Sequence, residues 1–191
     1  MPNLCDNRLT IWCDDPATVS TILEAGAPPS ISFLQKQGER FGFRQPSRSE
    51  TGFLHFLHPV PPNVEELDIE VLPQLPNKPK SYFWRLENWG CQNDLLFQFD
   101  QPSESELRAD FTTHYSPPVA ALQHGAAHHG FRFRLLYCET GGGFCGIATE
   151  AKNEEFEITF DRPPIEDGVP QELVDAFELN DVYLEFAADD E

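Results

Sequence analysis

Two stretches of the chain alternate strictly between apolar and polar residues. In residues 8–13 Leu9, Ile11 and Cys13 share one side and Arg8, Thr10 and Trp12 the other, and in residues 131–135 phenylalanine and leucine alternate with arginine. A period of two places one kind of side chain on each face of a β-strand. We therefore predict a strand with one buried face in each stretch.

A predicted helix follows the first of these strands, and another precedes the second. Asp-Pro at positions 15–16 can cap and begin a helix that Gly26 ends. Ser-Pro-Pro at positions 116–118 caps and begins the other helix, and Gly130 ends it. The chain thus contains a strand–helix unit near its start and a helix–strand unit beyond its middle.

Three consecutive glycines, at positions 141–143, follow the second strand. Glycine adopts positive φ angles readily, so this run predicts a tight turn into a returning strand over residues 144–150. Residues 116–148 therefore form one helix–strand–strand unit. Glycine loops can also cradle a phosphate, but this run opens no helix, so we interpret it as a hairpin turn.

The remaining segments are assigned from shorter patterns. Further strands are predicted at residues 53–57, 94–100, 107–113, 155–160 and 181–186, and further helices at residues 81–89 and 170–177. The order is typical of a ferredoxin-like α+β domain, an antiparallel sheet with helices on one face. We predict that residues 1–151 form this domain, with irregular insertions at about 27–51 and 58–106. Residues 152–191 are predicted to form a C-terminal extension packed on the same domain.

The charge balance changes the expected partners. The chain of 191 residues has 13 Lys and Arg against 32 Asp and Glu, a formal net charge of −19. A field of this sign repels nucleic acid and anionic lipid, so we expect no direct binding to nucleic acid or membrane. It favours a basic protein partner or a cation, although a solvated acidic surface without a special partner also explains it.

Acidic residues are concentrated in the C-terminal extension. From residue 150 onward only Lys152 and Arg162 are basic, and aromatic residues stand between the acids. Such a segment can form a negatively charged surface that meets a basic protein. The residues predicted to bind a partner are Glu154, Glu155, Glu157, Asp161, Glu166, Asp167, Asp175, Glu178, Asp181 and Glu185.

Histidine and cysteine residues offer a second kind of site. His124 and His128 are four residues apart on a predicted helix, a spacing that can chelate zinc. Cys138 and Cys145 flank the glycine turn and can face one another across it. A small metal-dependent or thiol enzyme centred on His124, His128 and Cys138 is thus the alternative function. The HExxH context is absent, so a solvated helix face and small core residues are simpler explanations, and we expect no cofactor.

The cysteines and the N-terminus indicate a cellular setting. The five cysteines include no close CxxC pair. The first residues lack the basic region and the apolar run of a secretory signal. No apolar stretch approaches the roughly 18 residues that a membrane helix needs. We therefore expect a cytoplasmic protein with reduced cysteines.

Several short motifs occur in an order known from one family. They are Met1-Pro2-Asn3 with Cys5, Asn7 and Leu9; Trp89-Gly90; Ser116-Pro117-Pro118; and Tyr137 with Glu139, Gly141, Phe144 and Gly146. In this order they resemble the YubB-like ferredoxin-like family of plasmid and bacteriophage proteins, over most of the chain up to about residue 151. Two positions depart from the family's pattern, since Leu4 and Tyr115 stand where tryptophan is usual.

The resemblance implies a fold and a setting, but no catalytic residues. It agrees with the ferredoxin-like sheet, and the family's members are generally of unknown function. In a plasmid or phage, an acidic accessory protein can protect the element from host nucleases. We therefore predict a non-enzymatic protein that binds a basic partner through its acidic extension. Its sharper form is a nucleic-acid mimic that inhibits a nucleic-acid-binding host factor of the anti-restriction or anti-CRISPR type.

Overall fold

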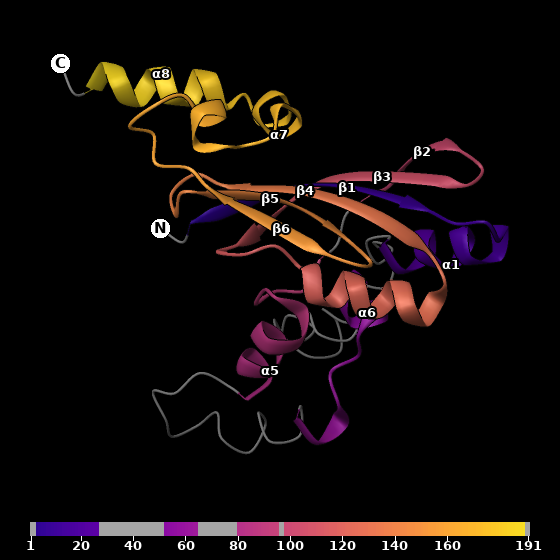
Figure 1. Ribbon diagram of the computed structural model, residues 1–191. Helices are drawn as coiled ribbons and strands as arrows, with labels where there is room; N and C mark the ends of the chain where they lie inside the picture. Colours follow the sequence, from indigo (N-terminus) through magenta and orange to yellow (C-terminus); the bar gives the residue numbers. More distant parts are fainter. Residues whose placement is uncertain (1–2, 27–51, 65–79, 96–97, 190–191) are drawn as a thin grey trace, which may run out of the picture.

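A computed structural model describes residues 3–26, 52–64, 80–95 and 98–189. At its centre is a six-stranded antiparallel sheet with the strand order β2-β3-β1-β4-β5-β6 (Figure 1). The strands are β1 (Leu4–Trp12), β2 (Asp100–Ser103), β3 (Glu106–His114), β4 (Arg132–Glu139), β5 (Phe144–Thr149) and β6 (Asn153–Glu157). Helices pack against this sheet, so the predicted α+β class is confirmed.

Strand β1 is central because it pairs with both β3 and β4. Its residues face β3 from Leu4, opposite His114, to Trp12, opposite Glu106. On its other side β1 pairs with β4. Buried and exposed residues alternate along β1, as the sequence predicts. One face of β1 therefore belongs to the core, and the other presents charged and polar side chains.

Helices lie on the core side of the sheet, and α5 packs on α6 below it (Figure 1). They are α1 (Pro16–Gly26), α3 (Phe53–Leu57), α5 (Lys80–Trp89) and α6 (Val119–His129). The main hydrophobic core includes Leu9, Phe133 and Leu135 from the sheet and Ile22 and Leu122 from the helices. Burial of apolar surface, worth about 25 cal/mol per Å², stabilises this helical layer on the sheet.

The connection from β3 to β4 passes across β1. Both strands pair antiparallel with β1, one on each side, and α6 joins them on the core face. This is the split β-α-β arrangement of ferredoxin-like sheets. Gly130 ends α6 in a left-handed conformation with φ of 73°, as the sequence predicts, and the chain then enters β4.

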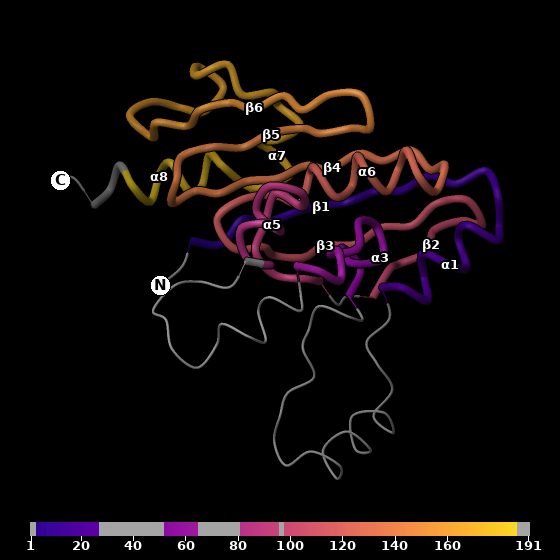
Figure 2. The backbone as a smooth tube through the Cα atoms, turned by 90° about the horizontal axis from the view of Figure 1, so that it is seen from below, coloured from indigo at the N-terminus to yellow at the C-terminus, as the bar shows by residue number. Residues whose placement is uncertain are grey.

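The C-terminal part of the chain packs on the opposite face of the sheet. It contains the 3₁₀ turn η1 (Pro164–Asp167), α7 (Gln171–Ala176) and α8 (Leu179–Asp189), which lie above the sheet in Figure 1. Leu173 and Val174 of α7 form a second hydrophobic cluster with Cys138, Cys145 and Ile147 of β4 and β5. Figure 2, seen from below, shows α7 behind these strands. Alternate residues of β1 and β3 are left exposed on this face.

Two segments predicted as strands are helices. Residues 53–57 form α3, because a short apolar run fits a buried helix as well as a strand. The Asp94 carboxylate favours the helix, since it accepts hydrogen bonds from the N–H groups of Leu54 and His55 in its first turn. Residues 181–186 lie inside α8, which packs on α7 and η1. Packing against neighbouring elements decides the conformation in both segments.

Other elements agree with prediction apart from their bounds. The helix predicted at residues 170–177 is α7, and the strand predicted at residues 155–160 is β6, which ends at Glu157. In the strand predicted at residues 94–100, residues 94, 95, 98 and 99 form no strand and β2 begins at Asp100, while residues 96–97 lie outside the described residues. The insertion at 27–51, and residues 65–79 of the second insertion, lie outside the described residues. Within the described ranges, no helix is long and apolar enough to span a membrane.

Candidate functional site

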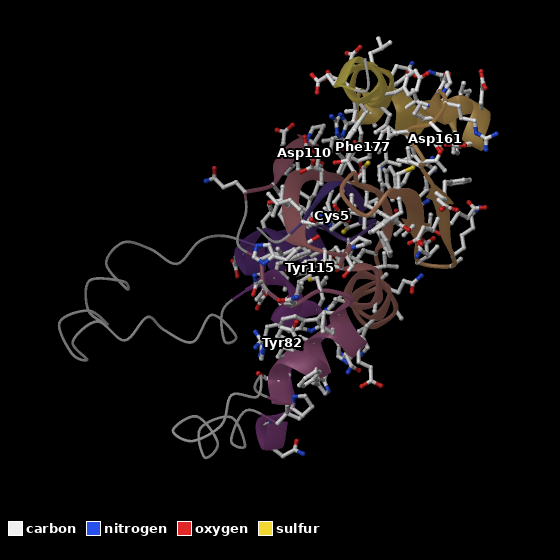
Figure 3. The ribbon with its side chains drawn as sticks, turned by 90° about the vertical axis from the view of Figure 1, so that its left-hand side faces the viewer. Cys5, Tyr82, Asp110, Tyr115, Asp161 and Phe177 are labelled. Carbon is white, nitrogen blue, oxygen red and sulfur yellow. The ribbon has the colours of Figure 1, made fainter. Side chains whose placement is uncertain are left out.

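The predicted partner-binding acids are spread over all the C-terminal elements. Three lie on β6, one follows it, two are in η1, one is in α7, and the others lie in or just before α8. All are exposed except Asp167, whose side chain is only 4% exposed. Together they form what we call the acidic surface, and Figure 3 shows Asp161 at this side of the molecule. Its carboxylates face solvent from one sheet edge and from the helices of the second face.

Some of these acids are already engaged within the chain. Glu154 lies 2.6 Å from the Nζ atom of Lys152. Asp167 accepts hydrogen bonds from the Thr159 N–H and hydroxyl and from Nε of Arg162. These bonds, that of the Thr159 N–H first, lower the pKa of Asp167. Asp167 therefore ties η1 to the segment after β6, which is a structural role.

A groove of about 450 Å³ lies between the exposed half of the sheet and the turn from α7 to α8. The sheet side of its wall carries Asp6, Arg8 and Asp110, and the helical side carries Phe177 and Glu178. Figure 3 shows Asp110 and Phe177 close together at this boundary. Three carboxylates and one guanidinium thus line the same groove.

The register of the sheet assembles the floor of this groove. Asp6 and Arg8 are two residues apart on β1 and point to the same face, away from the core. Pairing with β3 places Asp110 opposite Arg8. The guanidinium carbon of Arg8 lies 5.4 Å from the ring centroid of Phe177. The sequence indicated Glu178 but not Asp6, Arg8 and Asp110. Alternation shows which residues of a strand face solvent, but it does not show that the α7–α8 turn lies over them.

The rings of His124 and His128 on α6 lie in nearly parallel planes and do not converge on a point. The ring of His124 lies 3.7 Å from that of His58, with an interplanar angle of 6°, and 6.1 Å from that of His128. Nδ1 of His124 donates to the Leu57 carbonyl at 2.8 Å, and Nδ1 of His58 donates to the Asn88 carbonyl at 3.2 Å. Lone pairs on parallel rings do not meet at one metal ion. In the part of the chain that the structure describes, no group of three His, Cys, Asp or Glu could hold a metal ion.

Cys138 does not join these histidines. It belongs to the second cluster under α7, whereas α6 packs on the opposite face of the sheet. Cys145 lies directly across the hairpin from it, as predicted, and both thiols are free and buried. Burial raises the pKa of both thiols, that of Cys145 to about 12. A neutral buried thiol is a poor nucleophile. Because Cys138 and the histidines of α6 also lie on opposite faces of the sheet, the alternative enzymatic site is not assembled.

Residues that carry the family resemblance meet around the glycine hairpin. The Glu139 carboxylate accepts a hydrogen bond from the Gly141 N–H at 2.9 Å and one from Nδ2 of Asn3 at 3.4 Å. Gly146 leaves room for the ring of Tyr137, which a Cβ atom at this position would overlap. These contacts shape the hairpin and hold the N-terminus against it.

The Ser-Pro-Pro and Trp-Gly motifs also contact one another. The Ser116 hydroxyl donates to the Gly90 carbonyl and does not cap α6, because the helix begins after Pro118. Gly90 has φ of 88°, and a Cβ atom there would lie 2.6 Å from the Pro117 carbonyl oxygen. The predicted Ser116 cap is thus wrong, and the motif instead joins the start of α6 to the end of α5.

Comparison with known proteins returned no relative in sequence. No family model matches the chain, and no curated protein matches it. Among solved structures, the chain is similar to a crystal structure described as a protein api92 from Yersinia pseudotuberculosis, with the family model DUF1281. The TM-score is 0.46 at 11% identity, and the match covers 82% of this chain and 98% of that chain. A likeness of this degree says nothing about the function of this chain.

Proposed function

We propose that this protein acts without catalysis, by binding a basic protein through its acidic surface. The observation that carries this proposal is the solvent exposure of nine of the ten predicted acids on β6, α7, α8 and the adjoining turns. A negative surface on a chain of charge −19 steers a basic protein toward it and speeds their encounter.

The sharper form of the proposal is that the acidic surface imitates nucleic acid. Carboxylates that face solvent from a sheet edge and from helices can occupy the basic groove of a nucleic-acid-binding protein. Membership of the YubB-like family of plasmid and phage proteins, which we also propose, supplies the setting. In that setting the partner is a host defence factor of the anti-restriction or anti-CRISPR type. The contacts among Asn3, Glu139 and Gly141 support this membership, because they join separate pieces of the resemblance.

A capture experiment tests the proposal. The full chain is immobilised, host lysate is passed over it at low salt, and bound protein is eluted with a salt gradient. We expect a basic, nucleic-acid-binding protein that elutes with rising salt and is displaced by duplex DNA. A captured protein that is neither eluted by rising salt nor displaced by duplex DNA would contradict the proposal.

A matched pair of variants locates the binding surface. One variant replaces Glu178, Asp181 and Glu185 with the corresponding amides. The control removes three charges from exposed acids elsewhere, Glu24, Asp100 and Glu104. We expect the first variant to elute at lower salt than the control. Equal elution of the two would mean that net charge alone holds the partner.

A further inference from the structure

We infer that the groove between β1, β3 and the α7–α8 turn is where the basic partner docks, through a peptide segment that carries lysine or arginine. The inference rests on the proposed function and adds the place of contact and the chemistry of the ligand. At about 450 Å³, the groove is within the range of sites that enclose ligands.

The floor of the groove is a sheet face built from charged residues. Asp6, Arg8 and Asp110 are exposed there, on strands that α7 leaves open. Arg8 and Asp110 are directly opposite one another on antiparallel strands. Opposite charges in this relation are within reach of an ion pair, which stabilises a sheet. An Arg8–Asp110 pair is therefore the expected arrangement.

Arg8 does not form this pair. Its guanidinium instead lies over the Phe177 ring, at a distance typical of a cation–π interaction. None of Arg8, Asp6, Asp110 and Glu178 takes part in an ion pair between described residues. Phe177 thus holds the Arg8 guanidinium away from Asp110, and the carboxylates of the groove remain open to a ligand.

The charges of the groove favour a long basic side chain over an anion or a metal ion. An anion would meet three carboxylates and one guanidinium in a chain that is strongly negative overall. A Ca²⁺ ion needs several oxygen ligands at about 2.3–2.6 Å, and no described group of three acids is arranged to hold a metal ion. Lysine and arginine fit better, because their apolar stems can pack on Phe177 while their charged ends reach the carboxylates.

Binding of a labelled octa-arginine peptide, followed by fluorescence anisotropy, tests the inference. Asp110→Asn is expected to weaken binding about tenfold, because it removes a carboxylate from the floor of the groove. The control is Glu24→Gln, which removes one charge from an exposed position on α1, on the core side of the sheet and outside the acidic surface. We expect the control to change the affinity less than twofold.

Variants of the Arg8–Phe177 contact give a result that net charge alone does not predict. Phe177→Ala releases Arg8 to pair with Asp110, so the peptide should bind severalfold more weakly although no charge has changed. Arg8→Ala should bind more tightly than the wild type. The double variant should bind more tightly than Phe177→Ala, because no guanidinium is left to pair with Asp110. Thermal unfolding of each variant checks that it is folded, and Arg8→Ala, an exposed position, keeps the test decisive if Phe177→Ala does not fold.

The outcomes separate this inference from the function on which it rests. Equal loss in Asp110→Asn and Glu24→Gln would overturn the groove, whereas salt-dependent capture of a basic protein by the full chain would still support binding by the acidic surface. Weaker binding by Arg8→Ala would overturn the role of Arg8 and with it the inference. No binding of the peptide to the wild type would overturn both proposals. If the protein self-associates and Asp110→Asn abolishes this, the occupant of the groove is a second copy of the chain and not a basic peptide. If the groove takes up Ca²⁺ and binds no peptide, the occupant is a metal ion.

Discussion

Asp94 shows how one buried carboxylate can choose between two conformations of a neighbouring segment. It accepts hydrogen bonds from the N–H groups of Leu54 and His55, and so satisfies donors that the first turn of α3 leaves unpaired. Gly52 permits this approach, because a Cβ atom there would overlap the carboxylate. Burial nevertheless raises the pKa of Asp94 from 3.8 to about 6, against the effect of these hydrogen bonds.

The raised pKa of Asp94 predicts a pH dependence of stability. Between pH 3.8 and about 6 the folded state holds a proton that the unfolded state has lost, so this residue's contribution to the unfolding free energy falls as pH rises. The full fall corresponds to about 3 kcal/mol. Urea unfolding at pH 4, 5, 6 and 7 measures this fall. The unfolding free energy of the wild type relative to that of Asp94→Asn should decrease as the pH rises.

The comparison with Asp94→Asn is needed because other groups titrate in the same range. Burial lowers the pKa of His58 and His129, and neutral imidazoles stabilise the folded state above their unfolded pKa of about 6.5. Their contribution is lost as pH falls, which is the opposite sign to that of Asp94. A difference between wild type and Asp94→Asn that does not change from pH 4 to pH 7 would contradict the prediction.

The contact between α3 and α6 depends on a residue without a side chain. Gly125 lies in the interior of α6 and is buried, and the side chain of Leu57 fills the space beside it. Glycine inside a helix costs roughly 0.5–1 kcal/mol relative to alanine, so its presence here needs a packing reason. The reason is that a Cβ atom at this position would lie 2.5 Å from Cδ2 of Leu57.

Gly125→Ala is therefore expected to destabilise the protein. Overpacking of a core costs about 1–3 kcal/mol, which exceeds the gain in helix propensity and leaves a net loss of about 1–2 kcal/mol. Thermal or urea unfolding measures it. In the background Leu57→Ala, which removes Cδ2 but keeps the Cβ atom 2.9 Å away, the same substitution should cost less than in the wild type. If Gly125→Ala stabilises the wild type, α6 and α3 are not held this closely.

At the level of the whole molecule, the C-terminal part is a cover and not only a carrier of charge. Leu173 and Val174 bury Cys138, Cys145 and Ile147 on a face that would otherwise be open. The second half of β4 and most of β5 therefore carry apolar side chains on both faces, whereas the β1–β3 half of the second face and the start of β4, with Arg132 and Arg134, are polar. The acidic surface is attached to the sheet through this second cluster.

Loss of the cover is expected to expose an apolar face. A chain that ends at residue 159 lacks η1, α7 and α8, and should melt at lower temperature and bind a hydrophobic dye. In the full chain, Leu173→Ala should cost about 2–5 kcal/mol of unfolding free energy. Asp175→Ala, on the exposed side of the same helix, should cost less than about 1 kcal/mol. Similar losses in the two variants would show that α7 does not bury the second cluster.

The sequence by itself determined the features that depend on neighbouring residues. Alternation placed β1 and β4, glycine placed the end of α6 and the hairpin before β5, and the order of elements indicated an α+β fold. These predictions succeed because periodicity and turn chemistry are local properties of the chain. The identity of residues 53–57 was not local, since a short apolar run became helical through the carboxylate of Asp94, about 40 residues away in the chain.

Only the tertiary structure decided where the charges meet. The acids of the C-terminal extension could be named from composition, but the groove also needs Arg8 opposite Asp110 and Phe177 above them. Those three residues come from β1, β3 and the end of α7, and no local pattern links them. The sheet likewise separates Cys138 from His124, which the sequence alone had allowed in one site. Strand register and helix placement follow from burying two apolar faces at once, and that is a property of the whole chain.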